Sequence, residues 1–187
     1  MYLQLKIQLK GITKPPVWRE VLVPADYTFD ALHKVIIHSF GWGGGHLYTF
    51  TPSGQGSYPS IELTSDEFGY TSEYADMDSR KTKISKILGA EGIRFMYTYD
   101  FGDDWEHTIL VKAVKKGKLA HAELIGGKGK CPPDDCGGVG GYKDLLETLN
   151  NPKDPEYASM RDWLLLEEGE SWDPHQFDLE ATARYVR

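Results

Sequence analysis

The stretch that decides the fold is Tyr2-Leu3-Gln4-Leu5-Lys6-Ile7-Gln8-Leu9-Lys10, close to the start of the sequence. Aliphatic side chains stand at every odd position from Leu3 to Leu9, with polar residues between them. This period of two is typical of a β-strand that buries one face. Residues 17–23 read as a second strand, which Pro24 ends. The sequence therefore predicts an opening antiparallel hairpin.

A helix is expected after the hairpin. Asp26 or Thr28 can cap its start, and apolar residues recur at three- and four-residue steps up to Phe40. Residues 52–77 read as a loop, and residues 83–88 as a short amphipathic stretch. The remaining expected elements are strands over 46–51, 94–101, 107–114 and 120–125, and helices over 142–149, 157–166 and 178–185.

The fold class that follows is α+β. We expect a curved, mainly antiparallel sheet with the opening β-hairpin plus helix, and a C-terminal group of helices packed on it. Residues 1–187, with 40% hydrophobic content, suffice for one core, so a single domain is expected.

Charge and cysteine usage narrow the classes of protein. The formal net charge of −7 disfavours nonspecific binding to DNA, RNA or anionic membranes, which needs a basic surface. The opening residues do not resemble a signal peptide, and no apolar run is long enough for a membrane helix, so we expect no membrane association. Two cysteines are too few for a secreted disulfide scaffold. A cytoplasmic location is therefore expected.

Residues 97–107 are the segment densest in chemically useful side chains: Tyr-Thr-Tyr-Asp-Phe-Gly-Asp-Asp-Trp-Glu-His. Carboxylates and an imidazole crowd one tight turn, where they could reach one bound ion or one reacting proton. The alternative is an ordinary hairpin turn with packed aromatic rings, and we favour this structural interpretation over the functional one. The candidate catalytic residues are Asp100, Asp103, Asp104, Glu106 and His107, with Tyr99 and Trp105 as further site residues.

A second segment places Cys131 and Cys136 on either side of Pro132-Pro133-Asp134-Asp135. Such a stiff loop can present two thiolates to a borderline metal, with zinc the first choice. The candidate metal ligands are His107, Cys131, Cys136 and Asp134. A disulfide, a redox-active thiol pair and two small buried residues remain alternatives.

His46 follows a glycine-rich stretch beside Trp42 and Tyr48. It is a further candidate ligand or base, although a lone histidine near a strand start more often packs or lies on the surface.

These motifs together resemble the pRiA-type plasmid Orf-3-like family, over nearly the whole chain. The resemblance is carried by residues 5–7, 16–19, 41–48, 97–107, 131–142 and 172–179. It implies a mobile-element association, and the family is also labelled a passenger resolvase. A serine resolvase needs a nucleophilic serine among arginines and a basic DNA-binding helix, neither of which this acidic chain shows. The resemblance implies no catalytic residue.

Three functions follow from these patterns. The first is an interaction or accessory module whose aromatic and acidic loops contact a protein partner; it predicts exposed tryptophans and tyrosines. The alternative is a metal-supported site, hydrolase-like or structural, which predicts that residues 100–107 and 131–136 meet in space. The third is a DNA-transaction accessory protein using Lys112, Lys115, Lys116, Lys118, Lys128 and Lys130.

Overall fold

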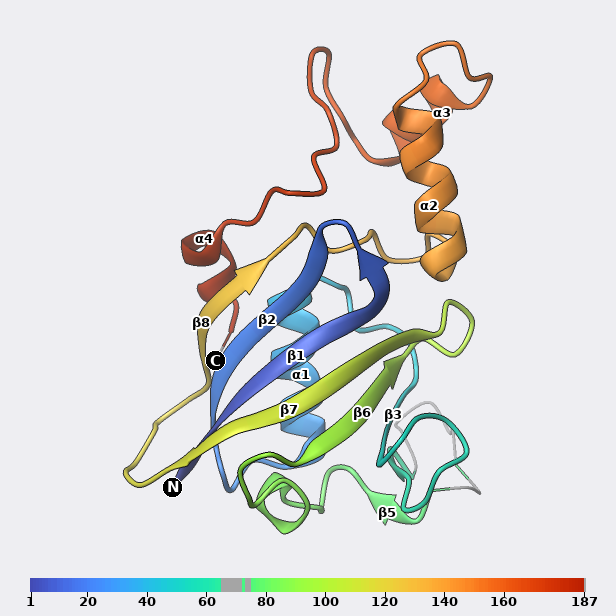
Figure 1. Ribbon diagram of the computed structural model, residues 1–187. Coiled ribbons are helices and arrows are strands. Elements are labelled where there is room, and N and C mark those ends of the chain that lie inside the picture. The colour runs from blue at the N-terminus through green and yellow to red at the C-terminus, as the bar shows by residue number, and fades with distance from the viewer. Residues whose placement is uncertain (65–71, 73–74, 187) are drawn as a thin grey trace.

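The computed structural model describes residues 1–64, 72 and 75–186. Its described part contains one eight-stranded sheet, ordered β5-β4-β3-β6-β7-β1-β2-β8 (Figure 1). All neighbouring strands are antiparallel except β4 and β5. The strands are β1 (Tyr2–Thr13), β2 (Pro16–Pro24), β3 (Tyr48–Thr51), β4 (Ile61–Glu62), β5 (Met77–Asp78), β6 (Arg94–Tyr99), β7 (Trp105–Lys115) and β8 (Glu123–Lys128).

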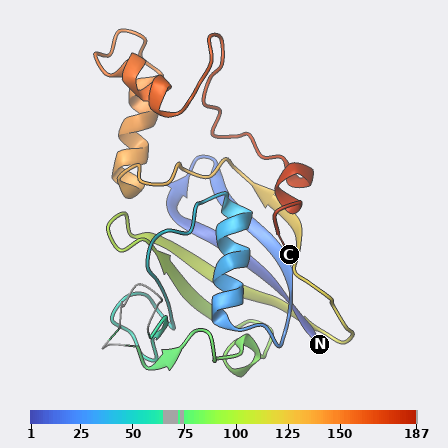
Figure 2. The ribbon, with the colours of Figure 1, turned by 180° about the vertical axis from the view of Figure 1, so that it is seen from behind.

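The helices lie on one face and at one end of this sheet. Helix α1 crosses one face, whereas no helix covers the opposite face among the described residues (Figures 1 and 2). The helices are α1 (Phe29–Phe40), the 3-10 turn η1 (Ile84–Lys86), α2 (Gly138–Leu149), α3 (Tyr157–Trp163) and α4 (Leu179–Ala183). The α+β class expected from the sequence is confirmed.

The core lies between α1 and the sheet. Alternate residues of β1 from Leu3 to Leu9 are at most 1% exposed, as the period-two pattern predicts. Burying each such aliphatic side chain stabilises the fold by about 1.5–3 kcal/mol relative to leaving it exposed. Thr28 caps α1 by accepting a hydrogen bond from the amide of Ala31. Gly41 ends the helix with a left-handed φ of 84°.

The C-terminal helices lie around the end of the sheet that holds the β1–β2 turn. Helix α4 lies beside β8, while α2 and α3 extend beyond that turn (Figure 1). Helix α2 begins at Gly138, earlier than expected from the sequence. The stretch 52–77, expected to be a loop, contributes the two-residue strand β4 and the start of β5, and its residues 65–71 and 73–74 lie outside the described ones. None of the helices in the described residues is long and apolar enough to span a membrane.

Candidate functional site: an acidic histidine pocket

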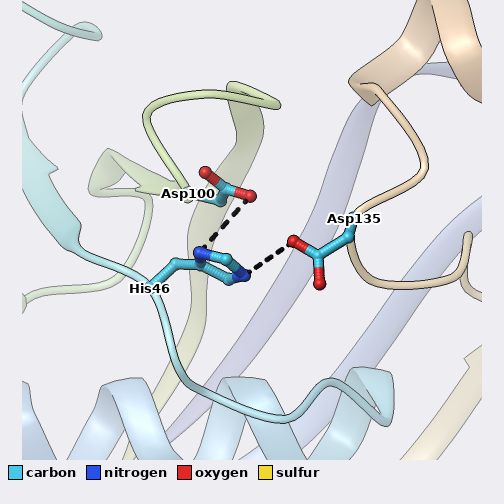
Figure 3. A group of neighbouring side chains, drawn as sticks. All are labelled: His46, Asp100 and Asp135. Carbon is cyan, nitrogen blue, oxygen red and sulfur yellow. Dashed lines mark ion pairs between the residues drawn. The ribbon is translucent and has the colours of Figure 1, made fainter.

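Three loops meet beside the end of β6 and bring together His46, Asp100 and Asp135 (Figure 3). His46 lies between α1 and β3, Asp100 directly follows β6, and Asp135 lies between β8 and α2. One donor atom from each residue lies within 4.8 Å of the other two. We call these three residues the acidic histidine pocket.

The imidazole of His46 lies between the two carboxylates. Its Nε2 is 3.0 Å from Asp135 Oδ1, and its Nδ1 is 3.7 Å from Asp100 Oδ2. The ring also meets Tyr99 edge-on, with centroids 5.6 Å apart. The pocket is half open, because the Asp100 side chain is only 11% exposed whereas the Asp135 side chain is 68% exposed.

The β3–β6 ladder sets the position of Asp100 relative to His46. Tyr48 pairs with Tyr99, and the ladder continues as the amide of Asp100 donates to the carbonyl of Leu47 at 2.9 Å. The backbone of Asp100 then turns into the left-handed region, with φ 54°, and its Oδ1 accepts a hydrogen bond from the amide of Gly102. Aspartate tolerates this conformation better than most residues because its carboxylate can bond to nearby backbone.

The loop that carries Asp135 is held against the other two by hydrogen bonds. Trp42 Nε1 donates to the carbonyl of Pro132 at 3.0 Å, and the amide of Gly43 donates to Asp134 Oδ2 at 3.0 Å. Asp135 itself has a left-handed φ of 58°. Two of the three pocket residues therefore have left-handed backbone conformations, which the contacts between the loops help to maintain.

A further contact joins the β6–β7 turn to the start of α2. The amide of Gly137 donates to Asp103 Oδ2 at 3.1 Å. Gly138 follows with φ 67°, and a Cβ there would lie 2.3 Å from the carbonyl oxygen of Asp103. Tyr99 also donates from its hydroxyl to Asp134 Oδ2 at 3.4 Å. The prediction that the turn and the cysteine loop meet in space is confirmed.

Negative charge dominates the surroundings of the pocket. Among the described residues, no Lys or Arg forms an ion pair with Asp100, Asp103, Asp134 or Asp135. The thiol of Cys136 is affected by this charge: burial, followed by the neighbouring carboxylates with Asp103 foremost, raises its pKa to about 12.

His107 does not reach the pocket. It is 0% exposed, packs edge-on against Phe40 and Trp42, and hydrogen-bonds through Nδ1 to the carbonyl of Trp105 at 2.9 Å. Burial lowers its pKa to about 3, so the ring is neutral. The alternation of β7 explains the placement, because every second residue from Trp105 faces the core.

The cysteines are likewise apart from a ligand cluster. Both are unbridged; Cys131 is buried and Cys136 is half-buried. Burial also raises the pKa of the Cys131 thiol well above its ordinary value. In the part of the chain that the structure describes, the candidate set His107, Cys131, Cys136 and Asp134 does not come together as a group of neighbouring donors.

The other candidates from the β6–β7 segment have separate roles. Glu106 pairs with Lys10 at 2.6 Å, and exposed Asp104 accepts a hydrogen bond from Gln55 Nε2. Tyr99 and Trp105 are both 0% exposed and belong to the aromatic core.

Sequence reasoning did not single out Asp135. The feature that could have indicated it is the Asp134-Asp135 pair in a proline-rich loop, since aspartate often occupies a left-handed turn position. The sequence does not show which of the two carboxylates faces His46.

The fold and the pocket together define an α+β protein with an acidic, histidine-containing pocket at the loops beside β6. The chain belongs to the family of plasmid pRiA4b ORF-3-like proteins, whose model matches residues 1–181. This confirms the family resemblance of the sequence.

Two related proteins are similar along most of the chain. "Uncharacterized protein y4hQ" of Sinorhizobium fredii is 32% identical over 162 residues, which cover 86% of this chain and 79% of that protein. The crystal structure titled "Protein of Unknown Function MM3350", from Methanosarcina mazei Go1, matches with a TM-score of 0.76 and 32% identity. That match covers 100% of this chain and 96% of the other, which supports the same fold throughout.

Proposed function

We propose that the protein binds one divalent metal ion through His46, Asp100 and Asp135, and that the ion supports a hydrolase-like reaction. The observation that carries the proposal is an imidazole set between two carboxylates from different loops, with no Lys or Arg pairing to either carboxylate among the described residues. A bound cation would offset the repulsion between these carboxylates.

Each carboxylate lies at a distance from His46 that a metal ion can bridge, but the two face different ring nitrogens, so one side chain must move for all three residues to hold one ion. Two ligand atoms about 2.1 Å from an ion lie about 3.0 Å apart at a right angle and about 3.4 Å apart at the tetrahedral angle. His46 Nε2 and Asp135 Oδ1 are already 3.0 Å apart. The exposed Asp135 side chain can adjust at low cost, while Asp100 is fixed by its backbone contacts.

The donor set favours particular metals. One nitrogen and two carboxylate oxygens suit Zn²⁺, Mn²⁺ or Fe²⁺, and of these Zn²⁺ binds such a site most tightly. Zinc was also the first choice from sequence, although the cysteines that suggested it are not part of this pocket.

An open site favours catalysis over a structural role. Structural zinc sites are usually closed by four protein ligands, whereas catalytic sites keep one position for water. Three ligands with one of them solvent-exposed leave that position free. Zn²⁺ held there would lower the pKa of a bound water to about 7 and so supply a hydroxide for hydrolysis.

The test is titration of metal-free protein with Zn²⁺ and Mn²⁺ by calorimetry. We expect one ion per chain, and at least about a tenfold loss of affinity in His46→Gln and Asp135→Asn, because a lost ligand should cost no less than a lost supporting contact. His175→Gln is the matched control, since His175 is exposed and lies outside the pocket. Metal retained in His46→Gln but lost in Cys136→Ser would refute this assignment.

An interaction module is the second proposal. It is supported by Trp163 and Leu165, which are 46% and 85% exposed near the end of α3. The aromatic residues of the β6–β7 segment do not support it, because Tyr99 and Trp105 are buried. Capture of a protein partner that is lost in Leu165→Ser would test it.

A DNA-transaction role ranks third. The lysines considered for it lie on β7, on β8 and in the loops next to these strands, and salt-dependent binding of duplex DNA would test it. We also propose a cytoplasmic location, which the two unbridged thiols support.

A further inference from the structure

A cavity of about 270 Å³ lies between the cysteine loop, α2 and α3. It shares Asp135 with the acidic histidine pocket, so the two sites adjoin. The residues that line it include Asp135, Asp144, Leu145, Glu156, Met160 and Trp163.

Every charged side chain that lines this cavity is acidic. Asp135, Asp144 and Glu156 contribute carboxylates, and no Lys or Arg lines it. Asp144 and Glu156 form no ion pair within the described residues; Lys143, which precedes Asp144 in sequence, pairs with Glu147 on the same helix. Glu156 precedes α3 but makes no side-chain capping bond there. These two carboxylates are therefore available to a ligand.

The other walls are apolar and suit an aliphatic chain. Leu145 of α2 is buried, and Met160 and Trp163 come from α3. A tryptophan face attracts cations, and the methylenes of a lysine or arginine side chain pack well on apolar surface while the charged end stays near water and carboxylates. Anionic ligands would be repelled by all three acids.

We infer that this cavity binds a lysine or arginine side chain of the substrate, next to the metal ion. That this side chain belongs to a substrate rests on the proposed function. The binding of a lysine or arginine side chain in the cavity does not. The proposed reaction is then hydrolysis of a compound, such as a peptide, that carries a basic side chain.

The test compares two probes of nearly equal shape, N-acetyl-lysinamide and its uncharged counterpart N-acetyl-norleucinamide. Binding to the full-length protein is followed by NMR and by tryptophan fluorescence. We expect the lysine probe to bind at least about fivefold more tightly, since one exposed ion pair contributes up to about that factor and three carboxylates line the cavity. Equal affinities for the two probes would overturn the inference.

Variants locate the binding in the cavity. Asp144→Asn and Glu156→Gln together should weaken the lysine probe by about tenfold, and Trp163→Leu by about threefold. Glu147→Gln is the matched control, because it removes a carboxylate from the same helix outside the cavity. A loss in the control equal to that in the double variant would attribute binding to general charge and refute the assignment.

The inference and the proposed function fail separately. His46→Gln should lose the metal ion and keep the lysine preference. Metal binding without any lysine preference refutes the inference alone, and a lysine preference without metal binding refutes the proposed function alone. With Mn²⁺ bound to the wild-type protein, the NMR signals of the lysine probe should relax faster than they do with His46→Gln. Equal relaxation rates would refute the proposal that the lysine side chain binds next to the metal ion.

Discussion

The neutral, buried imidazole of His107 predicts a specific dependence of stability on pH. Its pKa is lowered to about 3 in the folded protein, because burial disfavours the charged ring. In the unfolded chain it returns to about 6.5. The unfolded state therefore binds a proton first as pH falls, so the stabilising contribution is complete above pH 6.5 and is lost progressively towards pH 3.

The magnitude follows from these values. Between pH 7.5 and pH 5 the unfolded ring gains most of a proton while the folded ring gains almost none. The free energy of unfolding should fall by about 2 kcal/mol over that interval on account of His107. His33 is buried as well, and its pKa is also lowered to about 3, so it should contribute a similar amount.

The assay is urea denaturation at pH 7.5 and pH 5.0. His107→Asn keeps an amide that can bond the carbonyl of Trp105 but cannot titrate in this range. It should be less stable at both pH values because of the space it leaves, yet lose about 2 kcal/mol less than the wild type between them. His175→Gln should keep the full pH dependence. An unchanged pH dependence in His107→Asn would refute the reasoning.

Three further predictions concern the structure around the pocket. Arg19→Met removes four hydrogen bonds to backbone carbonyls from a side chain only 3% exposed, and should lower the free energy of unfolding by about 3 kcal/mol in urea denaturation. A loss under about 1 kcal/mol would contradict this. Gly138→Ala should lower the free energy of unfolding by about 2 kcal/mol and weaken metal binding, because its Cβ would lie 2.3 Å from a carbonyl oxygen. In Gly140→Ala the Cβ meets nothing within 4 Å, so the stability should not change. Equal melting temperatures for the two variants would contradict this prediction. The raised pKa values of Cys131 and Cys136 predict that both thiols react with a disulfide reagent at pH 8 much more slowly in folded protein than in urea, and equal rates would disprove it.

Much of the fold could be predicted because its main elements have local signals. The alternation in β1 and β2, the apolar face and Thr28 cap of α1, and the Gly-Asp turn between β6 and β7 all act within short windows of sequence. The start of α2 could not be predicted, because glycines disfavour helix. Here close packing requires Gly138 and Gly141: a Cβ on Gly141 would lie 1.9 Å from the carbonyl oxygen of Cys136.

The site could be predicted only in outline. Its segments were identified from their dense polar residues, and His46 and Asp100 were among the candidates. The ligand set was not, because it depends on how three loops meet, which no local pattern encodes. His107 could have been excluded from sequence, since the alternation that predicts β7 places it on the same face as Ile109 and Val111. That residues 1–187 form one domain stays a prediction.

The most direct test of the metal assignment is an anomalous difference map from crystals soaked in Mn²⁺. We expect one strong peak about 2.2 Å from an imidazole nitrogen of His46 and from carboxylate oxygens of Asp100 and Asp135. A map with no peak there, or with its peak beside Cys131 and Cys136, would contradict the proposed function.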